Sequence, residues 1–282
     1  MPQSAVPSLR QQRLGAELRK LREHAGLTST AAAELLGLNQ ARVSSIESGR
    51  YAVSAERVRA FARSYDCGDE RLVEAICAMT GGRTRGWWDD YREHLPAALV
   101  DLAELEYHAV ELRVSLVIHI PALLQTVDHA RALFREVAPP LLPYEVEHRL
   151  SHRIKRQGIL HGDRAVRYTA LIHEAALRMR FGGRDVACAQ LENIISMSER
   201  DNVIVRVTRF GGGFSGTGQS IDYLSGPVPQ LDTVQLDTHH GCEFLDARSQ
   251  LVKYSSVLDR MEAAALTPAE SRDFIQRLAR QL

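Results

Sequence analysis

The sequence predicts a multidomain fold in which an all-α domain is followed by a mixed α/β (α+β) domain. The chain has 282 residues, a length that favours two domains over one. Residues 9–79 carry apolar side chains at helical spacing, whereas the chain from 110 onward includes alternating, β-branched runs. The glycine-rich segment GGRTRG at 81–86 separates these two patterns. We therefore expect a helical domain at 1–80, a helical connector at 81–105 and an α/β domain at 106–282.

The overall composition is that of a globular chain, and it leaves any nucleic-acid binding to a local surface. Hydrophobic residues make up 45% of the chain and charged residues 25%, and 35 basic side chains balance 35 acidic ones. No apolar run approaches the ~20 residues that a membrane span needs, and the first residues do not read as a secretory signal. The four cysteines are too scattered for a disulfide framework. We expect a cytoplasmic protein with reduced thiols and no membrane partner.

Turn and cap residues divide the first domain into five expected helices. Gly26 and Gly37 end the first two, because glycine is the preferred residue just after a helix. Asn39 is a good N-cap for the third, and Ser54 for the fourth. The expected helices cover residues 9–25, 29–36, 40–49, 54–65 and 70–79.

The second domain is expected to mix strands and helices after a helical stretch that begins at Trp87. The segment 110–120 alternates and is rich in β-branched residues, so we expect a strand that ends at Pro121. Further strands are expected at 166–173, 203–210, 219–224 and 233–238. Helices are expected at 125–136, 143–158, 185–198, 249–264 and 268–281.

The second and third helices have the pattern of a helix-turn-helix. Ala33 is small where the two helices must cross, and Gly37 permits the tight turn between them. Leu38, Val43 and Ile46 are apolar where the third helix packs on the second. The outward residues of the third helix are small or polar, namely Gln40, Ala41, Arg42, Ser44 and Ser45. Such a face suits base edges and phosphates.

The local charge agrees with this interpretation. Between residues 8 and 65 the chain carries ten basic side chains and five acidic ones, although its total charge is zero. A local basic excess is the electrostatic footprint expected of a surface that approaches phosphates.

The stretch from Leu21 to Arg50, with its LREHAGLT, AAAELLGLNQ and IESG segments, resembles the XRE, or lambda-repressor-like, helix-turn-helix family. The resemblance implies binding to double-stranded operator DNA, with base-facing positions at Gln40, Ala41, Ser44 and Ser45. Arg42 is expected at phosphate. The family often has glutamine where this chain has Ser29, so we expect the flanking phosphate contact to be weaker or to involve Thr28 and Thr30. The full expected DNA-binding set is Thr28, Ser29, Thr30, Asn39, Gln40, Ala41, Arg42, Ser44, Ser45 and Arg50.

The same resemblance implies a structural ion pair between Arg22 and Glu47. We also expect a homodimer, because one recognition helix covers only a half-site. The alternative interpretation is a helical bundle that binds another protein and happens to share the turn.

The larger C-terminal part resembles WhiJ-like actinobacterial regulators. The resemblance covers residues 85–282 and rests on seven short segments: PALLQT at 121–126, RIKRQ at 153–157, IHEAAL at 172–177, GG at 182–183, QL at 190–191, NV at 202–203 and ALTPAES at 265–271. It implies a regulator linked to antibiotic production and development. It also implies an antitoxin-like domain, often encoded beside a small partner protein, but does not say what that domain binds. We expect the domain to bind a small co-encoded protein or a small-molecule effector.

Three clusters in the C-terminal part have ligand-type residues, and we expect neither a metal nor a cofactor at any of them. The glycine-rich run 211–218 lacks the Gly-Lys-Ser/Thr ending of a phosphate loop and favours a flexible connection. His148 and His152 lie one helical turn apart, but the zinc-protease glutamate is missing, so a solvated pair is expected. His239, His240 and Cys242 have ligand chemistry in a cramped arrangement.

An enzyme is the main competing hypothesis. Tyr168, His173, Glu174, Tyr223 and Asp237 would suit a divergent ADP-ribosyltransferase-like nucleotide pocket attached to a DNA-binding domain. Such a transferase generally needs a glutamate on a late strand, where this chain has Asp237. We therefore expect no catalysis. We predict a DNA-binding transcriptional regulator, more specifically a repressor. The third alternative is that the chain is an antitoxin that sequesters a small protein.

Overall fold

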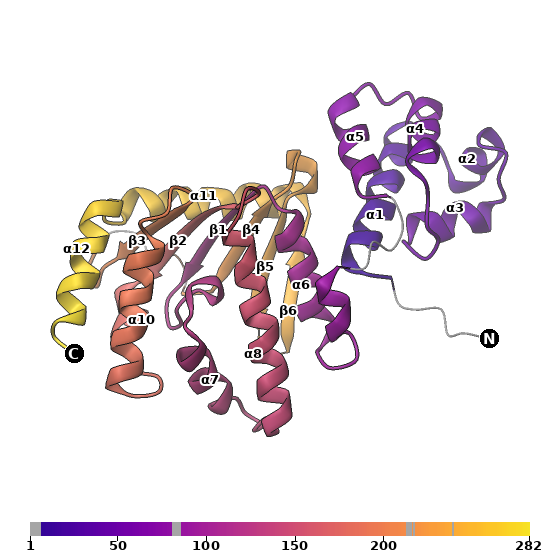
Figure 1. Cartoon of the computed structure of the whole chain (residues 1–282). Coiled ribbons are helices and arrows are strands. Elements are labelled where there is room, and N and C mark those ends of the chain that lie inside the picture. Colours follow the sequence, from indigo (N-terminus) through magenta and orange to yellow (C-terminus); the bar gives the residue numbers. More distant parts are fainter. Residues whose placement is uncertain (1–6, 81–85, 213–215, 217, 239) are drawn as a thin grey trace. The chain divides into compact units, whose positions relative to one another are not determined.

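The computed structural model describes residues 7–80, 86–212, 216, 218–238 and 240–282. The chain divides into an N-terminal unit, Met1–Asp89, and a C-terminal unit, Asp90–Leu282, each with its own internal packing. Figure 1 shows a wholly helical N-terminal unit and a C-terminal unit built on a sheet. The predicted fold class, all-α followed by mixed α/β, is confirmed.

The helices of the N-terminal unit begin where a polar side chain caps the first turn. Within residues 7–80 they are α1 (Leu9–His24), α2 (Ser29–Leu35), α3 (Gln40–Glu47), α4 (Ala55–Ser64) and α5 (Glu70–Ala78). Asn39 accepts a hydrogen bond from the backbone N–H of Arg42 at 2.8 Å, and Ser54 accepts one from Arg57 at 3.3 Å. Gly26 and Gly37 follow α1 and α2 with positive φ, as their roles beyond the helix ends require.

Two glycines allow α1 to approach the end of α3 closely. A Cβ on Gly15 would lie 2.5 Å from the carbonyl oxygen of Glu47, and one on Gly49 would lie 2.7 Å from that of Gln11. Gly49 also has φ +72, a conformation that favours glycine. The final residue of the sequence signature Ile-Glu-Ser-Gly is therefore needed for helix packing as well as for ending the helix.

The C-terminal unit contains a six-stranded sheet within the described residues, in the order β3-β2-β1-β4-β5-β6. Its strands are β1 (Glu111–Leu116), β2 (Arg167–His173), β3 (Val203–Thr208), β4 (Ile221–Ser225), β5 (Thr233–Thr238) and β6 (Gly241–Leu245). β1 pairs parallel to β2 and antiparallel to β4, so the sheet changes character at β1. β3 continues the parallel side, and β5 and β6 continue the antiparallel side.

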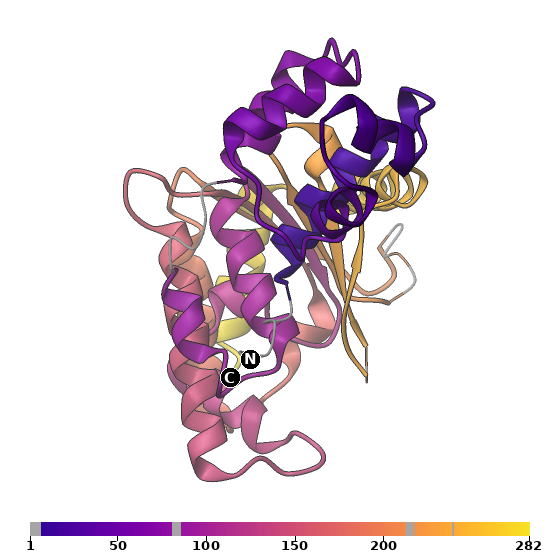
Figure 2. The same cartoon turned by 90° about the vertical axis from the view of Figure 1, so that its right-hand side faces the viewer.

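Helices cover both faces of this sheet (Figures 1 and 2). The α-helices are α6 (Ala97–His108), α7 (Val127–Arg135), α8 (Pro143–Gln157), α9 (Glu174–Arg178), α10 (Arg184–Met197), α11 (Arg248–Ala264) and α12 (Pro268–Ala279). Short 3-10 helices lie at η1 (Trp87–Tyr91), η2 (Ala122–Leu124), η3 (Gly158–Leu160) and η4 (Pro229–Leu231).

The alternation of side chains along the strands creates two separate cores. Leu112, Val114 and Ile172 face the layer that contains α6, α10 and α12. Leu171 and Leu236 face the opposite side and pack on α11. Within the described residues, no helix combines the length and the apolar character that a membrane crossing requires.

The sequence-based elements differ from the structure at two strands. The strand expected at 110–120 ends at Leu116, because residues 117–120 turn toward η2. The hairpin strand β6 was missed, because its side chains are mostly exposed or half-buried and give little hydrophobic alternation. The short helix α9 was also missed; it begins where the side chain of His173 accepts a hydrogen bond from the backbone N–H of Ala175.

Candidate functional site

The exposed face of α3 is formed by the residues that its packing leaves outside. Val43 and Ile46 are fully buried in the N-terminal unit and fix the rotation of the helix. Gln40, Ala41 and Ser44 are consequently exposed. An exposed face with polar side chains is thus held on a rigid element, as a face that reads base edges requires.

The start of α2 lies beside the start of α3. The side-chain amide of Gln40 donates to the hydroxyl of Ser29 at 3.4 Å. Thr28 uses its hydroxyl to cap α2, accepting from the backbone N–H of Ala31 at 3.1 Å, while Thr30 remains exposed. The beginnings of both helices therefore meet at one surface, where their free backbone N–H groups favour anions such as phosphate.

Two further side chains of α3 are already engaged within the unit. The guanidinium of Arg42 lies over the ring of Tyr51, with its central carbon 3.0 Å from the ring centroid. The hydroxyl of Ser45 donates to the carbonyl oxygen of Ala41 at 2.8 Å and remains able to accept. An open groove runs along this side of α3 and is lined by Gly37, Leu38, Asn39, Ala41, Arg42 and Ser45. The sequence analysis did not predict this role of Tyr51. The signal that could have indicated it was the aromatic side chain two residues after the IESG segment.

A bidentate ion pair joins α1 to the end of α3. Arg22 donates through Nε and Nη2 to the two carboxylate oxygens of Glu47, at 2.6 and 2.9 Å. Its Nη1 donates to the carbonyl oxygen of Leu27 at 2.6 Å. The hydrogen bond from Glu47 raises the pKa of Arg22 above its ordinary value, against the effect of burial. Both side chains are 9% exposed, so this pair belongs to the scaffold that positions α3.

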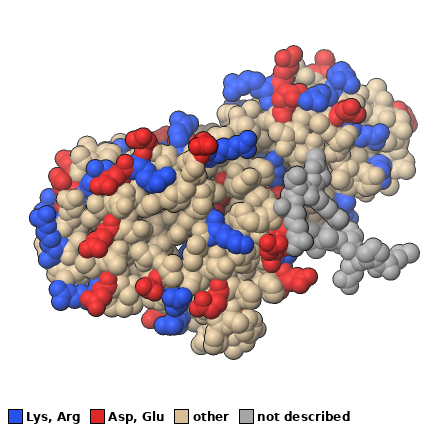
Figure 3. All heavy atoms as spheres, in the orientation of Figure 1, with Lys and Arg blue, Asp and Glu red and all other residues tan. Residues whose placement is uncertain are grey.

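The local basic excess concentrates near α3 and α4 once internal ion pairs are considered. Arg19 and Lys20 of α1 already pair with glutamates of the same helix. No ion pair in the described residues involves four of the other arginines, namely Arg42, Arg50, Arg57 and Arg63. On the face shown in Figure 3, basic and acidic side chains are otherwise interspersed. The arginines without an ion pair among the described residues therefore lie on α3, just after it and on α4.

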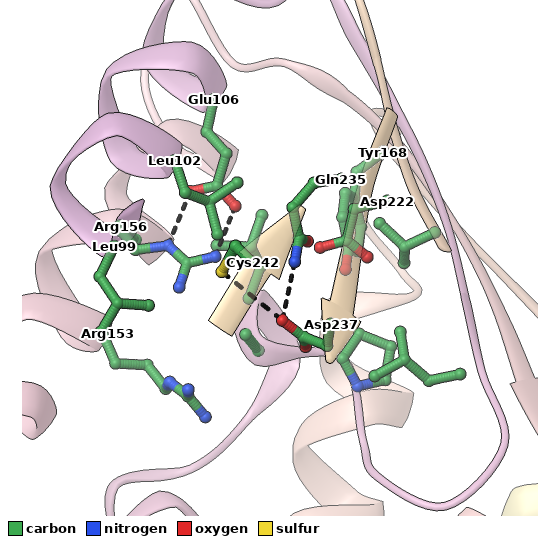
Figure 4. Close-up of a pocket in the computed structure, with 15 residues that line it drawn as sticks. Leu99, Leu102, Glu106, Arg153, Arg156, Tyr168, Asp222, Gln235, Asp237 and Cys242 are labelled. Atoms are coloured by element: carbon green, nitrogen blue, oxygen red, sulfur yellow. Dashed lines mark hydrogen bonds and ion pairs between the residues drawn. The ribbon is translucent and has the colours of Figure 1, made fainter. Parts of the chain in front are cut away.

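The C-terminal unit contains a cavity of about 110 Å³ between the sheet and the helices α6 and α8 (Figure 4). Strands β1, β2, β4 and β5 contribute to it, and the loop after β1 adds Pro121 and Ala122. Eight of the side chains that line the cavity have titratable or amide groups: Glu106, Arg153, Arg156, Tyr168, Asp222, Gln235, Asp237 and Cys242.

A buried ion pair forms one wall of this cavity. Arg156 donates through Nε and Nη2 to the two oxygens of Glu106, at 2.7 and 2.6 Å, with side chains 4% and 3% exposed. Burial alone would lower the pKa of Arg156, but Glu106 outweighs it and the pKa stays above its ordinary value. Arg153 lies one turn away, bonded to Gln125 and placed over the ring of Phe134.

The carboxyl of Asp222 faces this wall from β4 and has no hydrogen bond among the described residues. Burial raises its pKa to about 7, with repulsion from Asp237 and Glu106 adding to the shift and Arg156 opposing it. Asp237, by contrast, accepts a hydrogen bond from Gln235 at 2.7 Å. Tyr168 lies beside Asp222 in Figure 4, and burial raises the pKa of its hydroxyl. The cavity thus holds one carboxyl group that lacks a partner. In the sequence, the available signal was an aspartate inside a predicted strand.

The structure does not bring together all five residues that were considered for a nucleotide pocket. Tyr168 and Asp237 line the cavity. Tyr223 belongs to the opposite face of the sheet, where its hydroxyl donates to Asp232 at 2.9 Å. His173 caps α9 by accepting from Ala175, and Glu174 pairs with the neighbouring Arg178.

The expectation of a solvated pair at His148 and His152 was wrong for His152. His152 is 2% exposed and packs edge-on against Tyr91, and burial together with nearby Arg156 and Arg153 lowers its pKa to about 3. His148 instead stacks on His94. The described residues hold no group of three potential metal ligands. His239 and parts of the 211–218 run lie outside the described residues.

Comparison with known proteins gives two matches to family models. Residues 13–75 match a helix-turn-helix domain, and residues 99–277 match a domain of unknown function (DUF5753). No curated protein and no solved structure matches the chain. The helix-turn-helix match coincides with the unit that carries α3, and it indicates a DNA-binding regulator.

Proposed function

Because the chain belongs to the family of the domain DUF5753 and carries a helix-turn-helix domain before it, we propose that it is a sequence-specific transcriptional regulator. The observation that carries this proposal is the polar face of α3, exposed at Gln40, Ala41 and Ser44 and bordered by arginines without ion pairs in the described residues. Such a helix reads base edges in the major groove. Footprinting on the promoter of the protein's own gene tests the proposal directly.

Repression is the proposed outcome of this binding, and a homodimer is the proposed form. One recognition helix covers a half-site only, and specific affinity generally needs two half-sites about one helical turn apart. We expect sedimentation velocity at micromolar concentration to give a dimer, free or on an operator duplex. A monomer under both conditions contradicts the expectation.

Replacing Gln40 with alanine should weaken operator binding by about 1–3 kcal/mol and leave binding to a scrambled duplex unchanged, because an amide reads base edges. Replacing Arg42 with alanine should instead weaken binding to both duplexes and reduce the salt dependence by about one unit, because a guanidinium at phosphate releases counterions. Titrations of both variants against both duplexes at two salt concentrations measure the difference.

Gln12→Ala is a suitable control for these titrations, because Gln12 is an exposed amide on α1 whose hydrogen bond goes to the carbonyl oxygen of Pro7. It should bind both duplexes like the unaltered protein. If Gln40→Ala loses affinity for both duplexes equally, Gln40 does not read sequence and the recognition face lies elsewhere.

We further propose that the C-terminal unit receives the signal that controls DNA binding. The cavity between α6, α8 and the sheet supports a small molecule as that signal. The resemblance to WhiJ-like regulators supports a small co-encoded protein instead, and co-purification with that protein tests this alternative.

Binding without turnover is the proposed role of the cavity. Only two of the five residues that would suit a nucleotide-using transferase line it, and Tyr223 faces the other side of the sheet. Release of nicotinamide from NAD by the purified chain would contradict this proposal.

A further inference from the structure

We propose that the cavity in the C-terminal unit binds a small organic cation, an amine or amidine with a compact apolar body, whose charge pairs with Asp222. This inference deepens the proposed function, since it names the chemical class of the controlling signal, but the binding site stands on its own geometry.

The first argument is that two polar side chains that line the cavity lack hydrogen-bond partners. The carboxyl of Asp222 has no hydrogen bond in the described part of the chain, and the hydroxyl of Tyr168, a residue only 2% exposed, has none there either. Both line the same cavity, and Figure 4 shows them side by side. Polar groups removed from water normally have partners, so a pair without them indicates a missing ligand group.

The second argument compares Asp222 with the cations on the same wall. Nε and Nη2 of Arg156 are both occupied by Glu106. Arg153 donates through Nη1 to Gln125 and lies over Phe134, while its Nε is buried without a hydrogen-bond partner. Each guanidinium on this wall therefore has at least one partner, whereas the carboxyl of Asp222 has none among the described residues. An anion held by Arg153 is the competing outcome, and the benzoate probe below tests it.

The third argument comes from the charges that face Asp222. Three carboxyl groups meet here and can carry negative charge: those of Glu106 on α6, Asp237 on β5 and Asp222 itself. Two positive charges oppose them, on Arg156 and Arg153 of α8. The thiol of Cys242 and the phenol of Tyr168 remain neutral. The pKa of Asp222 near 7 reflects this incomplete compensation. A bound cation would supply the opposite charge and allow the carboxyl to ionise.

The remaining wall is apolar and sets the size of the ligand. The cavity has a volume of about 110 Å³. Its apolar lining comes from three elements: Leu99 and Leu102 of α6, Val114 and Leu116 of β1, and Leu123 of η2. That volume suits a single ring or a short chain carrying one charged group. A polyamine with several separated charges would place cations against leucines, which is unfavourable.

Calorimetry on the full-length protein at pH 8 tests the proposal with two amines and one amidine, each with a single charge: benzylamine, cyclohexylamine and benzamidine. Benzyl alcohol and benzoate are the neutral and anionic probes of matched shape. We expect at least one amine to bind ten times more tightly than either matched probe. The proposal is overturned if no amine binds, or if benzyl alcohol or benzoate binds as well as benzylamine.

The pH dependence and one variant assign the binding to Asp222. Amine affinity should fall about tenfold per pH unit below pH 7, because Asp222 must lose its proton to pair with the cation. Asp222→Asn should weaken amine binding at least tenfold at pH 8 and remove this pH dependence, whereas Asp201→Asn, at an exposed turn, should change neither. Equal amine affinity at pH 6 and pH 8 in the unaltered protein would overturn the assignment even if Asp222→Asn fails to fold.

A separate measurement distinguishes this inference from the proposed function. Footprinting with and without the bound amine reports whether the site controls DNA binding. Amine binding without any footprint leaves the cavity assignment intact and contradicts the regulatory role, whereas a footprint without amine binding contradicts the cavity assignment alone.

Discussion

Replacing Glu106 with alanine is expected to lower the free energy of unfolding of the C-terminal unit by about 3–5 kcal/mol. The substitution leaves the guanidinium of Arg156 buried, with its two shortest hydrogen bonds removed. A buried charge without a partner keeps its desolvation cost and loses the attraction that offset it. Urea unfolding followed by hydrogen exchange in β1 and α8 measures the change in the correct unit.

A surface glutamate on α8 provides the control for this experiment. Glu147 pairs with Arg131 at 3.4 Å but is largely exposed, so Glu147→Ala should change stability little. The double variant Glu106→Met with Arg156→Met should be more stable than Glu106→Ala, because it removes both charges and keeps apolar volume. If Glu106→Ala and Glu147→Ala have the same effect, the pair is not buried in solution.

Replacing Glu47 with alanine should destabilise the N-terminal unit by about 2–3 kcal/mol, because the substitution breaks both hydrogen bonds that Arg22 makes to it. The loss should exceed that of an ordinary surface pair, since Arg22 and Glu47 also fix α1 against the end of α3. We expect faster hydrogen exchange in α3 and weaker operator binding in proportion to the loss of stability.

The matched control is Glu74→Ala, which removes a glutamate paired with Arg59 at 2.8 Å on the exposed surface of the same unit. It should leave both α3 exchange and operator affinity close to those of the unaltered protein. Arg22→Lys should fall between the two, because lysine keeps the charge but cannot form the bidentate pair. Identical exchange in Glu47→Ala and Glu74→Ala would remove the scaffold role of the pair.

The sequence was sufficient for the N-terminal unit because its structure depends on local signals. The starts of two helices lie directly after the caps Asn39 and Ser54. The ends of two others lie within two residues of Gly26 and Gly37. The spacing of Val43 and Ile46 indicated which face of α3 is buried, and both are fully buried. The base-reading roles assigned to the outer face stay predictions.

The sequence was not sufficient for the close approach of α1 and α3 or for the cavity. Gly15 occupies a helix interior, where a glycine has no local role, and the nearby backbone of Ile46 and Glu47 explains it. Glu106, Arg156 and Asp222 come from three separate elements, and no spacing rule connects them. The strand β6 was missed because one largely exposed hairpin arm has little hydrophobic alternation.

The central position of β1 determines when the C-terminal unit can complete its sheet during synthesis. The helices of the N-terminal unit contact neighbours that follow soon in the chain, but Glu111 of β1 pairs with Ser225 of β4. At ordinary translation rates, roughly 5 to 20 seconds separate the synthesis of these two strands. During that interval one side of β1 has no neighbouring strand, and its apolar residues lack part of their cover. The nascent chain therefore presents a strand edge of the kind that chaperones protect, after its helical half has already been synthesised.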